Sequence, residues 1–188
     1  GDIALAMRLD HGGHLSHGHK VALTGKVYRF VHYGVDENGY INFDEVERLA
    51  IEHKPRLIIC GASAYPRIIP FDRFRAIADK VGAWLMVDGA HIEGLIAGGV
   101  HPSPFSHCHI FTTTTHKTLR GSRGALIFAR NDLEIKSPLS KARISIDAAI
   151  KRALFPGLQG GPHIHSVFAI LVALGETLRP EFKTYAEQ

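Results

Sequence analysis

The sequence has little of what defines several protein classes. Only two cysteines, Cys60 and Cys108, occur among 188 residues, too few for a disulfide framework, so a reducing compartment is expected. There is no apolar run of the roughly 20 residues that a membrane-spanning helix needs. The N-terminus has no signal-peptide pattern. We therefore expect a cytoplasmic protein without a membrane partner.

The sequence also lacks a large excess of either positive or negative charge. Twenty-two Lys and Arg against 18 Asp and Glu give a net charge of +4, and the basic residues are scattered apart from a cluster within 141–152. A nucleic-acid surface usually carries a basic stripe with interleaved aromatic residues, which is missing here. With 45% hydrophobic residues, the chain is long enough to bury one core, so residues 1–188 are expected to form a single domain.

Apolar runs alternate with helical patterns along the chain. Because the runs are apolar on both faces and the intervening helices span about ten residues, a three-layer α/β fold is expected, with a mostly parallel mixed sheet flanked by helices. The predicted strands are residues 56–60, 83–87, 110–115 and 124–129. The predicted helices are 44–53, 71–81 and 167–178. The polar stretch 131–152 is either an excursion from the core or a helix with a solvated face.

Polar side chains follow three of the predicted strands. Ser63, Asp88 and residues 115–117 each come at or just after the end of an apolar run. In parallel sheets the active groups lie at the carboxyl ends of the strands. We therefore expect these groups to converge on one crevice.

Lys117 and Asp88 are the chemically informative pair. Desolvation makes a neutral lysine amine available as a nucleophile for a Schiff base, although Lys117 could also be an ordinary charged turn residue. Asp88 either caps the next helix or pairs with a buried cation, such as the protonated pyridine nitrogen of pyridoxal phosphate. The spacing of about one strand–helix–strand unit lets both reach one ligand.

Two further segments allow two interpretations each. Residues 10–19 contain four histidines, which could bind a metal ion or form a glycine-hinged loop that lays an imidazole on an aromatic ring. Residues 157–163, GLQGGPH, could contact a phosphate through backbone N–H groups or be a plain loop.

Taken together, these segments resemble serine hydroxymethyltransferase, a fold-type I pyridoxal-phosphate enzyme, over most of the chain. The matching stretches are HGGHLSHG at 11–18, SAY at 63–65, VDGAHIEGL at 87–95, TTTTHKTLRGSR at 112–123 and FPGLQGGP at 155–162. The resemblance implies an incomplete large domain without the C-terminal small domain. It also implies reversible interconversion of serine and glycine, with tetrahydrofolate as co-substrate.

The resemblance implies specific roles around the cofactor. Lys117 would carry pyridoxal phosphate as a Schiff base, and Asp88 would pair with the pyridine nitrogen. His14 would stack on the cofactor ring. Ser63 and His91 would form hydrogen bonds around its phenolic oxygen.

Other roles concern the substrate side and the partner subunit. Thr114 and His116 would lie beside the lysine, and Arg123 would support the substrate side. Gly13 and Leu15 would lie where the family binds its folate. Gly160 and Gly161 would reach the cofactor phosphate of a neighbouring subunit. A homodimer or homotetramer is therefore expected.

The chain also departs from the family pattern. Ser122 stands where proline is usual, Ala125 where glycine is usual, Gly89 where a larger residue is usual, and Glu93 where alanine is commoner. Residues 133–150 form a longer polar stretch than compact members have. A carboxylate at Glu93 would disturb the local charge if it points inward.

Because the family's other catalytic segments have no counterpart here, the isolated chain is expected to have little activity. Three alternatives stay open. The chain could be another fold-type I enzyme, such as a threonine aldolase-like protein. It could instead be a non-catalytic fragment that binds partners or RNA, or a histidine-rich metal-binding module.

Overall fold

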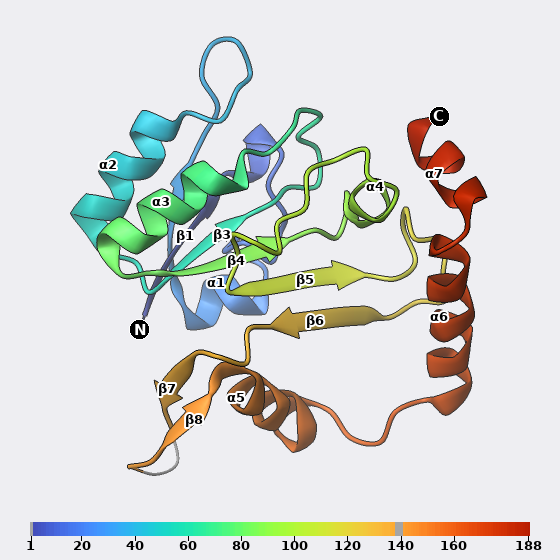
Figure 1. Cartoon of the computed structure of the whole chain (residues 1–188). Helices are drawn as coiled ribbons and strands as arrows, with labels where there is room; N and C mark the ends of the chain where they lie inside the picture. Colours follow the sequence, from blue (N-terminus) through green and yellow to red (C-terminus); the bar gives the residue numbers. More distant parts are fainter. Residues whose placement is uncertain (1, 138–140) are drawn as a thin grey trace.

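The computed structural model describes residues 2–137 and 141–188 and contains a six-stranded mixed sheet (Figure 1). The spatial order is β2-β1-β3-β4-β5-β6, parallel from β2 to β5, with β6 antiparallel to β5. The strands are β1 Ile3–Met7, β2 Arg29–Tyr33, β3 Leu57–Cys60, β4 Trp84–Asp88, β5 Ile110–Thr114 and β6 Ala125–Ala129. The expected mostly parallel mixed sheet flanked by helices is confirmed.

Two helices, α2 (Phe43–His53) and α3 (Phe71–Val81), pack side by side over one face of the sheet (Figure 1). The side chain of Asn42 accepts a hydrogen bond from the Glu45 N–H at 3.0 Å, which caps the start of α2. The helix α3 starts after Pro70 and ends at Gly82 in the left-handed conformation, as expected from those residues.

The other face of the sheet is less covered. The short helix α1 (Leu23–Val27) lies near β2 on this side, and a cavity of about 480 Å³ opens between it and the sheet. Phe30, Trp84 and Met86 line this cavity. The difference between the two faces is visible along β4. Leu85 and Val87 are buried, whereas the alternate residues of this strand are half-buried.

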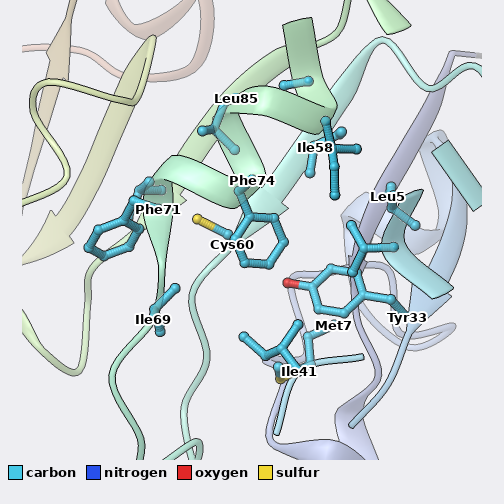
Figure 2. Close-up of a cluster of buried hydrophobic side chains, with 14 of the residues drawn as sticks. Leu5, Met7, Tyr33, Ile41, Ile58, Cys60, Ile69, Phe71, Phe74 and Leu85 are labelled. Carbon is cyan, nitrogen blue, oxygen red and sulfur yellow. The ribbon is translucent and has the colours of Figure 1, made fainter. Parts of the chain in front are cut away.

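The core lies between the sheet and the helices α2 and α3 (Figure 2). The rings of Tyr33, Phe43 and Phe74 meet there, with centroid distances of 5.6 Å from Phe74 to Tyr33 and 4.9 Å from Phe74 to Phe43. Phe74 and Tyr33 are fully buried. This packing fixes β3 and β4, whose ends carry polar residues of the candidate site.

The remaining elements follow β4. They are α4 Glu93–Ala97, β7 Glu134–Lys136, β8 Arg143–Ser145, α5 Ile146–Arg152, α6 Ile164–Thr177 and α7 Pro180–Glu187, with short turns at Leu9–His11 and Ala153–Leu158. The stretch 131–152 is thus a two-stranded hairpin followed by a helix, and its residues 138–140 lie outside the described residues. None of the helices in the described ranges is long and apolar enough to cross a membrane.

The predicted elements agree closely with the observed ones. The helix predicted at 71–81 has those bounds, and the helices predicted at 44–53 and 167–178 correspond to α2 and α6. The four predicted strands correspond to β3, β4, β5 and β6.

Candidate active site

A cavity of about 500 Å³ opens at the carboxyl ends of β3, β4 and β5. It brings together most of the residues singled out in the sequence. Those lining it are His14, Ser63, Asp88, His91, Thr114, His116, Lys117 and Arg123. Four separate chain segments, at or after the ends of β1, β3, β4 and β5, therefore converge on this edge of the sheet, as expected for parallel strands.

Asp88, the last residue of β4, is held by two hydrogen bonds. Its Oδ2 accepts from Nε2 of His17 at 2.9 Å, and its Oδ1 accepts from the Ala90 N–H at 3.1 Å. Burial raises the pKa of the Asp88 carboxyl, but these bonds to the charged form outweigh it, so the pKa lies below its usual value. Asp88 is therefore a fixed anion at the cavity wall.

The tautomer of His17 follows from its partners. The backbone N–H of His14 donates to Nδ1 of His17 at 3.4 Å. Because Nδ1 accepts, the proton that His17 shares with Asp88 is on Nε2. His17 is 3% exposed. The buried imidazole thus orients the Asp88 carboxylate through its Nε2–H.

Lys117 lies beside His91, with 3.1 Å between Nζ and Nε2. Burial lowers the pKa of His91, and the positive charge of Lys117 lowers it further. His91 is therefore neutral near pH 7 and accepts the hydrogen bond from the lysine. Lys117 is half-buried, and its contact with His91 orients the amine.

Thr114 joins the end of β5 to the turn after β4. Its Oγ1 lies 3.1 Å from the Ala90 carbonyl oxygen and 3.3 Å from Oε1 of Glu93. Thr114 therefore ties the segment that ends in Lys117 to the segment that starts at Asp88.

Two buried polar atoms at the cavity have no hydrogen-bond partner within the described chain. These are Oγ of Ser63 and Nδ1 of His116. Arg123 donates to Nε2 of His116 at 3.1 Å, so the neutral imidazole of His116 carries its proton on the unpaired Nδ1. Unpaired buried donors of this kind suit a ligand with acceptor oxygens.

Glycines allow the strand ends to approach each other. Gly61 has a φ of 120°, and a Cβ there would collide with the Asp88 carbonyl oxygen. A Cβ at Gly89 would collide with the ring of Phe111. The departure from the larger residue expected at position 89 is therefore explained by the packing of Phe111.

The other predicted site residues lie outside this cavity lining. Gly13 is buried in the loop after β1 and Leu15 is exposed. Gly160 and Gly161 are exposed in the loop before α6, so the cofactor-phosphate role expected for them in a neighbouring subunit stays a prediction.

The histidine-rich segment does not assemble a metal site within residues 2–137 and 141–188. No group of three or more His, Cys, Asp or Glu side chains there could hold a metal ion. Nδ1 of His14 lies 2.7 Å from Oγ of Ser16, and His17 contacts Asp88. Among these histidines, His17 is the residue that sequence reasoning missed, and its contact with Asp88 spans 71 residues.

Replacing His17 with alanine is expected to lower the free energy of unfolding by about 1–3 kcal/mol, because the half-buried Asp88 carboxylate loses one of its two hydrogen-bond donors. Urea denaturation at pH 7 measures this loss. His165, exposed on α6, provides the matched control, and His165→Ala should change stability by less than about 0.5 kcal/mol. Equal effects of the two substitutions would contradict the anchoring role of His17.

Comparisons with known proteins bear on this site. Residues 1–188 match the family described as serine hydroxymethyltransferase. Serine hydroxymethyltransferase 1 of Pseudomonas savastanoi is 55% identical over 188 residues, which cover 100% of this chain and 42% of the relative. Serine hydroxymethyltransferase of Rhizorhabdus wittichii is 58% identical over 187 residues, which cover 99% of this chain and 40% of the relative.

Serine hydroxymethyltransferase 2 of Pseudomonas fluorescens is 53% identical over 188 residues, with the same coverage as the first relative, 100% and 42%. The chain thus spans about two-fifths of the length of these relatives. The match extends over the whole chain and includes the segments that form the cavity. The chain therefore belongs to the serine hydroxymethyltransferase family.

Proposed function

We propose that this chain forms the cofactor-binding part of a pyridoxal-phosphate-dependent hydroxymethyltransferase that interconverts serine and glycine with tetrahydrofolate. One observation carries the proposal: the amine of Lys117 and the fixed anion Asp88 line the same cavity. An aldehyde-bearing cofactor with a basic ring nitrogen needs one nucleophile and one anion in such a place.

The described residues fit this cofactor. Asp88 would hold a proton on the pyridine nitrogen, and its pKa below the usual value keeps the carboxylate charged at neutral pH. The unpaired hydroxyl of Ser63 is available to the phenolic oxygen, together with His91. His14 would cover one ring face. When bound, pyridoxal phosphate supplies an electron sink for negative charge at the substrate α-carbon.

The remaining residues would shape the substrate side. The unpaired N–H of His116, held by Arg123, is placed to donate to an acceptor oxygen of the amino-acid substrate. Thr114 keeps the lysine-bearing segment in position. Gly13 and Leu15, in the loop after β1, would face the folate.

The assembly is also a proposal. Several large apolar side chains of α6 are exposed, including Val167, Phe168 and Leu171, and apolar surfaces of this kind support contact with further polypeptide. We expect a homodimer or homotetramer in the cytoplasm, with Gly160 and Gly161 contributing to the site of a neighbouring subunit. The described chain would then be one partial domain with little activity by itself.

Titration with pyridoxal phosphate, borohydride reduction and peptide mapping test this proposal. We expect a visible absorption band and a pyridoxyl group on Lys117, both lost in Lys117→Arg. Lys80→Arg is the control, because Lys80 pairs with Glu47 on the surface of the helix layer. Labelling that is spread over exposed lysines and unchanged in Lys117→Arg would refute the proposal.

A further inference from the structure

Glu93 is a buried acid that the proposed chemistry does not use. It is the first residue of α4, directly after the turn that contains His91 and follows Asp88, the last residue of β4. It is 4% exposed, and its Oε2 is buried without a hydrogen-bond partner within the described chain. Burial of an unpaired carboxylate oxygen is costly, so this position favours the neutral acid.

The contacts of Thr114 indicate where the proton of Glu93 goes. A threonine hydroxyl has one proton to donate, yet Oγ1 of Thr114 lies within hydrogen-bond distance of both the Ala90 carbonyl oxygen and Oε1 of Glu93. The carbonyl can only accept. If Thr114 donates to Ala90, the second contact is a hydrogen bond only when Glu93 donates a proton to Oγ1. A neutral Glu93 therefore completes the chain Glu93–Thr114–Ala90.

The charges on the cavity side of Glu93 act in opposite directions. Lys117, beyond the end of β5, favours the ionised acid, but burial has the larger effect and raises the pKa of Glu93 to about 7. Hydrogen bonds to the ionised form also lower the pKa of Glu93, but their effect is smaller than that of burial. Asp88 ends β4, and the neutral His91 lies in the turn just before α4.

On its other side, α4 packs against α7. Gly98 at the end of α4 meets Ala186 and Lys183 of α7. The side chain of Lys183 is 68% exposed, and its amine lies 3.8 Å from a carboxylate oxygen of Glu187. This exposed pair is screened by solvent, so Lys117 is the principal charge that acts on Glu93.

We propose that Glu93 is a proton-controlled positioning residue for Lys117. With its proton, Glu93 holds the Thr114–Ala90 bridge between the two segments that carry Asp88 and Lys117. Without its proton, Glu93 accepts from Thr114 instead, which removes the donor from Ala90, and it places a buried negative charge near Lys117.

The second state disfavours attack by Lys117 on an aldehyde. A nearby anion stabilises the ammonium form, whereas the amine must lose a proton before its nitrogen can bond to the aldehyde carbon and water can leave. Loss of the Glu93 proton as pH rises therefore lowers the reactivity of the Lys117 amine toward an aldehyde. The consequence for cofactor capture rests on the proposed function, but the protonation of Glu93 does not.

The first test measures the proton on Glu93 directly, in the chain without added cofactor. With carbon-13-labelled glutamate, NMR titration is expected to show one carboxyl signal with a midpoint near pH 7 that is missing in Glu93→Gln. Absence of such a signal would overturn the inference, whether or not pyridoxal phosphate binds.

The second test measures the reactivity of Lys117 with formaldehyde and cyanoborohydride, a probe that needs no cofactor site. Methylation of Lys117 is quantified by peptide mass spectrometry at about pH 6 and about pH 8.5, with Lys80 as internal reference. The methylation rate of Lys117 should increase between these two pH values in both proteins. The increase in Glu93→Gln should be at least about three times that in the unsubstituted chain. Equal increases would contradict the inference.

Glu93→Ala separates charge from bridging. It should share the larger pH-dependent increase, because the charge is gone in both variants. Unlike Glu93→Gln, whose amide still donates to Thr114, it should show faster amide hydrogen exchange in the turn after Asp88. If alanine and glutamine behave identically in exchange, the bridging part is wrong. Failure of pyridoxal phosphate to label Lys117 would count against the proposed function alone.

Discussion

Replacing Phe74 with alanine is expected to lower the free energy of unfolding by about 3–5 kcal/mol. The Phe74 ring is fully buried and lies against Tyr33 (Figure 2). It also packs against Phe43 of α2. Its removal deletes apolar contacts and leaves a cavity that rigid strands cannot close. Because a domain of this size has only about 5–15 kcal/mol of stability, a large part would be lost. Urea denaturation followed by circular dichroism measures the change.

Ile51→Ala is the matched control, since Ile51 lies on α2 but is 47% exposed. We expect it to change the free energy of unfolding by less than about 1 kcal/mol. A Phe74→Ala variant as stable as Ile51→Ala would mean that the aromatic cluster does not hold the helices on the sheet.

This cluster also positions the candidate site. The helix α3 packs on β3 and β4, and Ser63 and Asp88 come at or just after the ends of these strands. Functional groups on rigid elements keep their geometry better than groups on free loops. Repacking beneath β4 is therefore expected to affect the cavity even though Phe74 does not line it.

The central part of the fold could be predicted because each signal was local. The strands β3 to β5 are continuous apolar runs, and α3 is bounded by Pro70 and Gly82. The convergence of Asp88 and Lys117 then follows from the rule that parallel strands present their carboxyl ends at one edge.

The strands β1 and β2 could not be predicted in this way. β1 has the sequence IALAM, and alanine, leucine and methionine all favour helices. It is a strand because β2 and β3 pair with it on both sides, which is tertiary context. β2, RFVHY, lies at the sheet edge and is mostly half-exposed, so no buried pattern marks it.

Within the site, the contact that sequence reasoning could not supply is that of His17 with Asp88. Nothing in the local sequence distinguishes which histidine of this loop contacts Asp88. Only the folded path of the loop brings His17 rather than His14 to the carboxylate. Glu93 was recognisable as a departure from the family pattern. Its burial and its contact with Thr114 needed the structure.

Stability is expected to fall as pH rises from about 4.5 to about 7, through Glu93. Its pKa is raised from 4.5 to about 7 in the folded chain, so in this interval the folded state binds more protons than the unfolded state. The free energy of unfolding therefore decreases with pH. At about 1.4 kcal/mol per pKa unit, the loss is about 3 kcal/mol by pH 7.5.

The difference between the unsubstituted chain and Glu93→Gln isolates this contribution. Burial lowers the pKa of His14, His91 and His109, and these groups act in the opposite sense, since the unfolded state binds more protons near their usual pKa. Their contribution is common to both proteins and cancels in the difference. Urea denaturation at several pH values should show Glu93→Gln gaining stability over the unsubstituted chain as pH rises from 4.5 to 7.5. A constant difference across this range would show that Glu93 ionises in the folded chain as it does in the unfolded one, and the proton-controlled link to Lys117 would then fail with it.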